Sequence, residues 1–211
     1  MKLQVAVDSG GRDSLLRMAE RVYDLVDIIE VGTPMIILDG QNPVRALRNK
    51  YPAACIVSDT KIMDGGSTEA QYACEAGADI VTVLAVSSLK TISAVVSEVH
   101  RYSKQVLADL IDVQDVVRRT KQLDAMGVDY ICVHTAYDVQ PTGVTPLADL
   151  EKVMATVKNS KVAVAGGISK KTIREVAKMG PDLVIIGGAI TNAVDPRTEV
   201  EKYRKIIKRT L

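Results

Sequence analysis

The chain of 211 residues contains no tryptophan and no phenylalanine, and its only aromatic residues are seven tyrosines. Because 47% of the residues are apolar, a core built from this sequence must be largely aliphatic. The formal net charge of +1 gives no general attraction to nucleic acid or to an anionic membrane. No apolar run approaches the length that spans a bilayer. The sequence predicts a globular protein with neither nucleic acid nor a membrane as its partner.

Cysteine and histidine are also scarce, with three and two residues. The spacing of Cys55, Cys74 and Cys132 matches neither a zinc knuckle nor a C-x-x-C motif. Cys55 and Cys132 lie in apolar, strand-like runs, so we expect both to be small core residues, with a buried disulfide as the alternative. The opening "MKLQVAVDSGG" enters such a run at once and lacks the pattern of a signal peptide. We therefore expect a reducing, cytoplasmic location.

An internal repeat organises the chain. The stretches "VDIIEVGT", "GADIVTVLA", "GVDYICVHT" and "GPDLVIIGG" each place an aspartate before a short β-branched run. These aspartates are Asp27, Asp79, Asp129 and Asp182, separated by 52, 50 and 53 residues. Four such periods account for almost the whole chain, and a fixed period is a signal of architecture.

Each period also contains a second apolar run: "LQVAV", "ACIVSD", "QVLADL" or "KVAVAG". Eight short apolar strands alternate with about eight helix-like segments, of which 169–180 is expected to start with Ser169 as its N-cap and stop at Gly180. This alternation predicts a single (β/α)8 barrel domain over residues 1–211. The rival is a doubly wound open sheet, but an open sheet has no need of a regular fourfold period.

The predicted strands end in ionisable residues. Functional sites of such barrels lie at the carboxyl ends of the strands. The carboxylates expected there are Asp8, Glu30, Asp59 and Asp109, together with the ammonium of Lys61 in "SDTKIMDGG" and the imidazole of His134. So many carboxylates repel one another unless cations neutralise them, and an all-oxygen donor set favours Mg²⁺ over Zn²⁺.

The basic residues of this group have distinct expected roles. Flanking carboxylates favour the ammonium form of Lys61, which makes it a poor Schiff-base nucleophile. His134, at a strand end, suits general acid–base work, whereas His100 is expected to be a solvated residue at a helix end. Asp64 lies further out, where it could be a charge at a helix N-terminus or could reach a site.

Two glycine pairs follow the seventh and eighth strands, in "AGGI" at 165–168 and "GGAI" at 187–190. Glycine allows the backbone to approach a phosphate closely, and helix N-termini offer free N–H donors. The alternative for each pair is a tight turn. The occurrence of both pairs at these two strand ends favours a phosphate site built mainly from backbone N–H groups.

The pattern D-x-K-x-x-D after the third strand, with Asp8, Glu30 and the two glycine pairs, resembles the orotidine-monophosphate-decarboxylase suprafamily. Within it the chain is similar over essentially its full length to the hexulose-6-phosphate synthases. The matching stretches include "IIEVGTP", "DTKIMDGG", "GVDYICVHTAYDVQ", "VAVAGGI" and "VIIGGAIT". The resemblance implies a reversible, Mg²⁺-dependent aldol reaction of ribulose 5-phosphate with formaldehyde, through a metal-stabilised enediolate.

The resemblance also implies roles for individual residues. Glu30 and Asp59 would bind the metal, Asp8 and Lys61 would position and polarise the sugar, and His134 would shuttle a proton. Asp109 would contact hydroxyls or metal-bound water, and Asp64 would reach into the neighbouring site of a homodimer. The residues implied to hold the phosphate are Gly166, Gly167, Ile168, Gly187, Gly188 and Ala189.

Several alternatives come from the same group of folds. A 3-keto-L-gulonate-6-phosphate decarboxylase resembles this chain, but it typically carries other residues where this chain has Asp109, Tyr137 and Gly188. An orotidine-monophosphate decarboxylase would carry an arginine after the eighth strand, and a ribulose-phosphate 3-epimerase would carry a two-histidine metal site; neither is found here. A sugar-phosphate-binding protein without turnover is the non-enzymatic alternative. Thr60 departs from the methionine usual in the synthases, and strand alternation predicts that it points away from the neighbours of Lys61.

Overall fold

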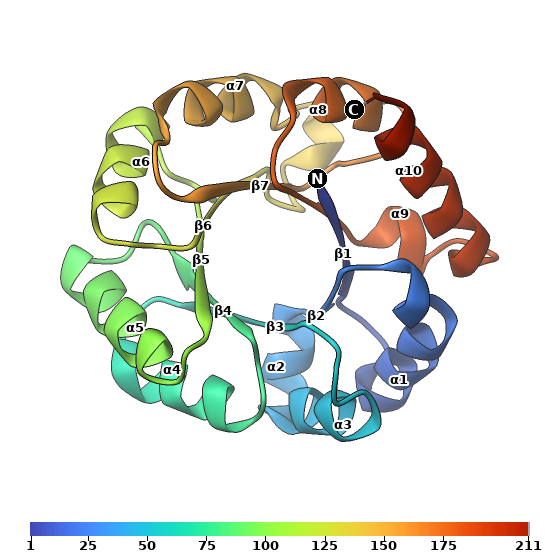
Figure 1. The fold of residues 1–211 in the computed structure, drawn as a ribbon, viewed down its shortest axis with the longest axis horizontal. Coiled ribbons are helices and arrows are strands. Elements are labelled where there is room, and N and C mark those ends of the chain that lie inside the picture. Colours follow the sequence, from blue (N-terminus) through green and yellow to red (C-terminus); the bar gives the residue numbers. More distant parts are fainter. Residues whose placement is uncertain (211) are drawn as a thin grey trace.

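A computed structural model describes residues 1–210 and shows eight parallel strands closed into one barrel, each paired with its sequence neighbours and β1 paired with β8 (Figure 1). This architecture confirms the predicted (β/α)8 fold and excludes the open sheet. The strands are β1 (Lys2–Val7), β2 (Ile28–Val31), β3 (Ile56–Ile62), β4 (Ile80–Leu84), β5 (Gln105–Asp109), β6 (Tyr130–His134), β7 (Lys161–Ala165) and β8 (Leu183–Ile186).

The helices form a ring outside the strands (Figure 1). They are α1 (Gly11–Val22), α2 (Thr33–Asp39), α3 (Asn42–Lys50), α4 (Gly66–Glu75), α5 (Leu89–Arg101), α6 (Val116–Ala125), α7 (Leu147–Thr156), α8 (Ile173–Met179), α9 (Gly188–Thr191) and α10 (Pro196–Thr210), with 3-10 turns η1 (Tyr23–Leu25) and η2 (Gln140–Thr142). Two helices follow β2 and two follow β8, which exceeds the expected eight.

The start of α8 differs from the prediction. The helix begins at Ile173 with Thr172 at its N-cap, and it ends at Gly180 in the left-handed conformation, as expected. Ser169 was predicted as the N-cap and this is wrong. Its carbonyl instead accepts the N–H groups of Thr172 and Ile173 in a turn that precedes the helix.

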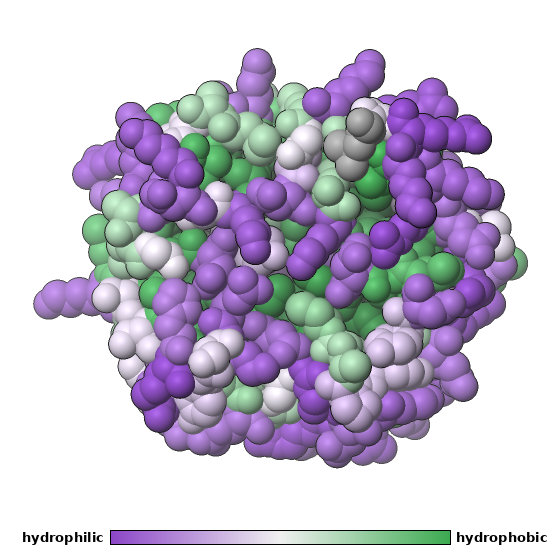
Figure 2. Space-filling view, in the orientation of Figure 1, coloured by the Kyte–Doolittle hydropathy of each residue, from purple (hydrophilic) through white to green (hydrophobic). Residues whose placement is uncertain are grey.

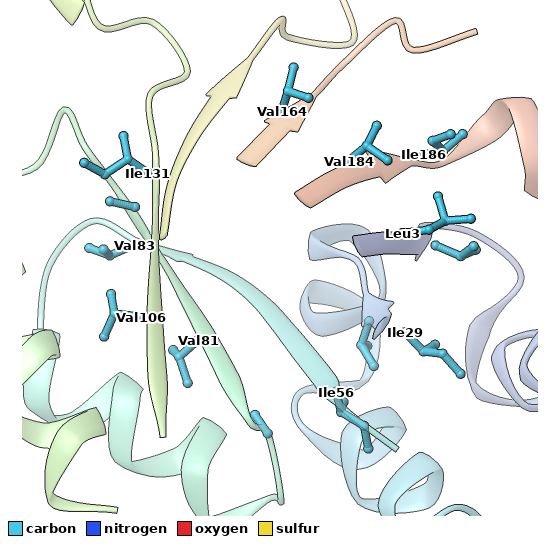
Figure 3. Close-up of a cluster of buried hydrophobic side chains, with 14 of the residues drawn as sticks. Leu3, Ile29, Ile56, Val81, Val83, Val106, Ile131, Val164, Val184 and Ile186 are labelled. Carbon is cyan, nitrogen blue, oxygen red and sulfur yellow. The ribbon is translucent and has the colours of Figure 1, made fainter. Parts of the chain in front are cut away.

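Strand side chains that point away from the barrel axis form an aliphatic belt under the helices (Figure 3). Its members are almost entirely Val, Ile, Leu and Ala, as the lack of Phe and Trp requires. Burial of such side chains stabilises the fold by about 1.5–3 kcal/mol each. Hydrophilic side chains cover much of the outer ring in Figure 2, so the helices are amphipathic.

Side chains that point into the barrel are stacked in layers, as alternate strands contribute alternate levels. The layer nearest the amino ends of the strands is Ile28, Ile80, Tyr130 and Leu183, and all four are buried. Moving toward the carboxyl ends, the interior becomes polar, and its buried polar side chains are Gln4, then Glu30 and Thr82, then Asp59 and Asp109. The interior therefore changes from an apolar layer at the amino ends of the strands to an acidic group that includes Asp59 and Asp109 at the carboxyl ends, which we call the barrel mouth.

The placement of the cysteines follows from this packing. All three cysteines are free; Cys132 is buried inside the barrel, while Cys55 is only half-buried. The expectation of two core cysteines is thus confirmed for Cys132 and only partly for Cys55. Within residues 1–210, no helix combines the length and the hydropathy needed to cross a bilayer.

The four repeated aspartates have a structural role. Each carboxylate accepts the backbone N–H of a residue at the start of the preceding strand, at 2.8 Å for Leu3, 3.0 Å for Ile56, 2.9 Å for Val106 and 2.8 Å for Val162. Each of these N–H groups lies one residue before the first residue that pairs with the following strand, so that strand offers it no carbonyl. The repeat therefore encodes four hydrogen bonds that fasten odd strands to even strands at the amino end.

Asp79 is the most heavily bonded of the four. Besides the N–H of Ile56, it accepts hydrogen bonds from Lys104 at 2.6 Å and from Arg48. Partial burial disfavours the carboxylate, but these three donors outweigh it and lower the pKa of Asp79 below its usual value. Ionised Asp79 is therefore favoured by the folded state.

Replacing Asp79 tests this role. Asp79→Ala leaves the N–H of Ile56 and the two cations without their acceptor, and we expect the free energy of unfolding at pH 7 to fall by about 1–3 kcal/mol in urea titrations. Asp149→Ala is the matched control, because the side chain of Asp149 is 47% exposed and its ion pair is with the exposed Lys152. Its expected loss is below about 0.5 kcal/mol. Equal losses in the two variants would contradict the role assigned to Asp79.

The lowered pKa of Asp79 also predicts how the stability difference between wild type and Asp79→Ala depends on pH. A lowered folded pKa means that the contribution of Asp79 is fully present above the unfolded-state pKa of about 3.9 and disappears as the pH falls through the lower folded value. The difference in stability between wild type and Asp79→Ala should therefore be constant above about pH 5 and shrink below about pH 4.

Candidate active site

The expected acid–lysine pair lies at the barrel mouth. Lys61 Nζ forms an ion pair with Asp59 Oδ2 and lies 3.9 Å from Asp109 Oδ2. Thr33 Oγ1 lies 2.7 Å from Asp59 Oδ2 and accepts a hydrogen bond from Lys61 Nζ at 3.1 Å. Thr82 Oγ1 donates to Asp59 Oδ1 at 2.8 Å. Residues of strand β4 and of helix α2 thus hold both carboxylate oxygens of Asp59, and Thr33 of α2 also contacts the lysine.

Strand β3 is irregular where it carries these residues. Ser58 pairs with Val81 and Ile62 pairs with Val83, so residues 59–61 lie opposite Thr82 alone. Lys61 has φ = 46°, in the left-handed region that non-glycine residues rarely adopt. The sequence predicted that this strand ends near Asp59. The strand instead continues to Ile62, because pairing with β4 resumes at Ile62 after the bulge.

His134 and Asp109 form a second pair. His134 Nδ1 lies 2.8 Å from Asp109 Oδ2, and Asp109 Oδ1 accepts the backbone N–H of Ile111 at 2.9 Å. A carboxyl oxygen beside Nδ1 favours the tautomer that carries its proton on Nδ1, which leaves Nε2 as the free ring nitrogen. His134 is therefore oriented as a base at the mouth.

Glu30 lies deeper and has one amide partner. Gln4 Nε2 donates to Glu30 Oε2 at 2.5 Å, and both side chains are buried. Gln4 Oε1 has no hydrogen-bond partner within residues 1–210 although it is buried. Sequence reasoning missed Gln4, Thr33 and Thr82; their only signal was that polar residues occupy apolar runs or follow a strand end.

Asp8 occupies the rim between the ends of β2 and β8. Its carboxylate lies so close to the backbone of Gly32 that a Cβ there would be 2.0 Å from Oδ1. A Cβ on Gly187 would be 3.4 Å from Asp8 Oδ2. The acidic group of the mouth therefore adjoins the glycine turn after β8, as a site for one small ligand requires.

The carboxylates have opposed pKa shifts. Burial disfavours ionisation of Asp59, but the charge and hydrogen bond of Lys61 outweigh it and lower the pKa of Asp59. Burial, followed by the negative charge of Asp59, raises the pKa of Glu30 well above its usual value. Limited hydration in the mouth and the charge of Asp59 also raise the pKa of Asp8. One lysine thus neutralises only part of the negative charge.

Lys61 itself remains a cation. Burial favours its neutral amine, but the charges of Asp59 and Asp109 outweigh burial and raise the pKa of Lys61 above its usual value. This direction agrees with the expectation from sequence that the ammonium form is favoured. The side chain can stabilise negative charge and donate hydrogen bonds, but it lacks the lone pair that an imine would require.

The donor set suits a small hard cation. Glu30 and Asp59 offer carboxylate oxygens, and a divalent cation would favour the ionised form of a carboxyl group whose pKa is raised by a like charge. Mg²⁺ is often held by only one or two carboxylates, with water and substrate oxygens completing its shell. No group of three or more His, Cys, Asp or Glu side chains suited to a metal is found in the described part of the chain.

The glycine turns lie at the ends of β7 and β8. Gly166 and Gly167 have φ of 81° and 69°, and a Cβ on Gly166 would lie 2.1 Å from the carbonyl oxygen of Thr135. Gly188 and Ala189 begin the short helix α9 and are exposed, Gly187 is half-buried, and Ile168 is buried. These placements are compatible with the predicted phosphate site.

Three residues lie outside this group or differ from expectation. Asp64 is exposed in the loop after β3. His100 is exposed in the last turn of α5, as expected, and its Nε2 also lies 2.9 Å from Asp129 Oδ2 at the amino end of the barrel. The expectation for Thr60 is wrong, because the bulge breaks strand alternation and Thr60 Oγ1 donates to the carbonyl of Thr82 at 2.8 Å.

A small cavity adjoins His134. Its volume is about 170 Å³, and it is lined by the loops after β5 and β6, including Leu110, Val113, Ala136 and Pro146. A larger cavity of about 260 Å³ lies near Cys55 and Asp27 at the amino ends of β2 and β3, away from the charged residues described above. The cavity at the carboxyl ends is the one that adjoins the acid–base pair.

The fold and the mouth define a (β/α)8-barrel enzyme with a charged lysine–carboxylate–histidine site. The family described as orotidine 5'-phosphate decarboxylase / HUMPS matches residues 1–203. The chain belongs to this family, as the sequence motifs indicated. It is accordingly an enzyme of the carbon–carbon lyase type.

Individual relatives agree with this assignment. The chain is 45% identical over 208 residues to a 3-hexulose-6-phosphate synthase of Staphylococcus haemolyticus, covering 99% of each chain. The crystal structure of 3-hexulose-6-phosphate synthase from Salmonella typhimurium superimposes with a TM-score of 0.97 at 41% identity, covering 100% of both chains. A KGPDC from Streptococcus mutans, solved in complex with a sugar phosphate, has a TM-score of 0.92 at 26% identity, covering 99% of this chain and 98% of that one.

The turn at Gly166 gives a prediction for stability. Gly166→Ala would place a Cβ against the backbone of Thr135 and would also strain a positive φ, so we expect a loss of about 3 kcal/mol or more in urea titrations. Gly143→Ala is the matched control, because φ is 86° and nothing lies within 4 Å of its Cβ. Its expected loss is only about 1–2 kcal/mol. Similar losses would show that close approach to Thr135 is unimportant.

Proposed function

We propose that the protein catalyses the reversible condensation of ribulose 5-phosphate with formaldehyde to arabino-hex-3-ulose 6-phosphate. The observation that carries the proposal is the joint placement of the Lys61–Asp59 pair and the His134–Asp109 pair at one barrel mouth. An ammonium and an oriented imidazole are the groups needed to form and stabilise an enediolate anion. Full-length similarity to enzymes named 3-hexulose-6-phosphate synthase supports this substrate.

His134 carries the proton in this scheme. Nε2 takes the proton from the carbon beside the carbonyl of ribulose 5-phosphate, and the electron pair moves onto the carbonyl oxygen. The resulting enediolate attacks the carbon of formaldehyde, which forms the new carbon–carbon bond and places negative charge on the formaldehyde oxygen. That oxygen takes the proton back from Nε2, so the base is regenerated. Asp109 holds Nδ1 throughout and keeps Nε2 directed at the substrate.

Lys61 supplies fixed positive charge. Its ammonium, held by Asp59 and Thr33, stabilises the oxygen on which the enediolate charge develops. Glu30 and Asp59 would hold Mg²⁺, which when bound would supply Lewis-acid stabilisation of that charge. Asp8 would accept hydrogen bonds from sugar hydroxyls, and the glycine turns after β7 and β8 would hold the phosphate through backbone N–H groups.

We also propose that the active form is a homodimer in which Asp64 reaches the site of the neighbouring subunit. Large apolar side chains are exposed in α2 and in the loop after β3, including Ile37 at 80%, Leu38 at 74% and Met63 at 52%. Met63 directly precedes Asp64. Exposed apolar side chains of this size are typical of a surface that is covered by another protein.

An activity assay tests the proposed reaction. Formaldehyde consumption is measured with ribulose 5-phosphate, in parallel with carbon dioxide release from 3-keto-L-gulonate 6-phosphate, each with and without EDTA. We expect turnover of the first pair, loss of it in EDTA and recovery with added Mg²⁺. Activity on the keto-gulonate alone would replace the synthase by the decarboxylase. Binding of ribulose 5-phosphate without exchange of its α-proton in D₂O would indicate a non-catalytic binding protein.

Hybrid dimers test the sharing of sites. Lys61→Ala and Asp64→Ala should each fold and each lower kcat by about 100-fold or more, because each removes a charge from every site. Mixing equal amounts under conditions of subunit exchange should restore up to about a quarter of wild-type activity, because half the dimers then hold one intact site.

The matched control for Asp64 is Glu69→Ala, which removes an exposed acidic residue from the first turn of α4. It should leave activity unchanged, both alone and in mixtures. If Lys61→Ala turned over at the wild-type rate, Lys61 would be removed from the mechanism. An absence of recovery in the mixture, or a monomer in solution, would contradict the shared site.

A further inference from the structure

We propose that Thr82, on strand β4, is the positioning residue that fixes Asp59 and Lys61 in their working geometry. The proposal deepens the proposed function and rests on it for its kinetic test. It starts from the bulge in β3, where Asp59, Thr60 and Lys61 lie opposite Thr82 as their only counterpart in the neighbouring strand. All three of these residues form a hydrogen bond to Thr82.

The hydroxyl of Thr82 has both of its functions in use. Oγ1 accepts the backbone N–H of Lys61 at 2.9 Å and donates to Asp59 Oδ1 at 2.8 Å. A hydroxyl is the smallest group that can accept one hydrogen bond and donate another at the same atom. A single atom thus joins the backbone of the lysine to the carboxylate that its ammonium contacts.

The lysine backbone depends on this acceptor. At φ = 46°, Lys61 adopts a conformation that persists in a non-glycine residue only where its surroundings hold it. The bulge removes the N–H of Lys61 from regular pairing between β3 and β4, and Thr82 Oγ1 takes the place of the missing carbonyl. Without it, the N–H would lose its partner and the left-handed conformation would lose its support.

The side chain is well placed for this task. Thr82 is 3% exposed and points into the barrel at the level of Glu30, directly below the layer of Asp59 and Asp109. Its contacts are to protein groups of the site, so it acts through Asp59 and Lys61. Loss of the hydroxyl should misplace the ammonium while leaving the glycine turns after β7 and β8 untouched.

The kinetic test compares Thr82→Val with Thr82→Ser. Valine has the shape of threonine without the hydroxyl, and serine retains the hydroxyl. Misplacement of a catalytic group by about 1 Å can cost about 100-fold, so we expect kcat of Thr82→Val to fall by about 10- to 100-fold. KM for ribulose 5-phosphate should stay within about 3-fold of wild type, because phosphate contacts supply binding energy remote from the reacting carbon. Thr82→Ser should retain most of kcat.

Thr60→Val is the matched control. It removes a hydroxyl from the same bulge, but that hydroxyl bonds the carbonyl of Thr82 and touches neither Lys61 nor the carboxylate of Asp59. Its kcat should fall much less than that of Thr82→Val. An equal fall in Thr60→Val, an equal fall in Thr82→Ser, or an unchanged kcat in Thr82→Val would each overturn the proposal. If Thr82→Val does not fold, Thr82→Ala against Thr82→Ser provides the same comparison.

Hydrogen exchange gives a readout that does not depend on the reaction. The amide of Lys61 should lose protection by about 10-fold or more in Thr82→Val and keep it in Thr82→Ser, since only the first removes its acceptor. A wild-type protein without turnover would overturn the proposed function, and the exchange measurement would still decide the role of Thr82. Unchanged protection of the Lys61 amide in Thr82→Val would overturn the role of Thr82 whatever the activity.

Discussion

Closure of the sheet is the constraint on which the rest of the molecule depends. Because β1 pairs with β8, every strand has two neighbours, and side chains can point only into the barrel or under the helices. This geometry stacks the interior into layers and decides which polar residues can meet. Asp59 and Asp109 come from strands that are not adjacent, yet they lie at the same level within reach of one ammonium.

The charge balance of the mouth follows from that stacking. Burial makes Asp8, Glu30 and Asp59 costly to ionise, and Lys61 lies close enough to stabilise mainly Asp59. Glu30 and Asp8 keep a raised pKa, which is the electrostatic state that a cation would relieve. Chemistry that creates a new negative charge on a substrate suits a site whose donors are fixed before the substrate arrives.

The ring of strands could be predicted because period, apolar runs and strand-end carboxylates all point to one architecture. The proximity of Asp59 and Lys61 could also be predicted, because the predicted architecture places both residues at the end of one strand. The role of Thr82 was not, because it depends on a local irregularity in strand pairing that leaves no mark on apolar patterning. The N-cap of α8 was misplaced because a turn of serine and threonine imitates a helix start.

The repeated aspartates divide the barrel into quarters. Each quarter holds one odd strand, one even strand and the carboxylate bond that joins them at the amino end. The donor and the acceptor of each of these hydrogen bonds therefore lie within one quarter. A gene in which the four quarters were reordered cyclically, with new termini before β3, β5 or β7, would preserve all four bonds. A single chain thus contains four similar units, each of which is joined at its amino end by its own hydrogen bond, as four separate subunits would be.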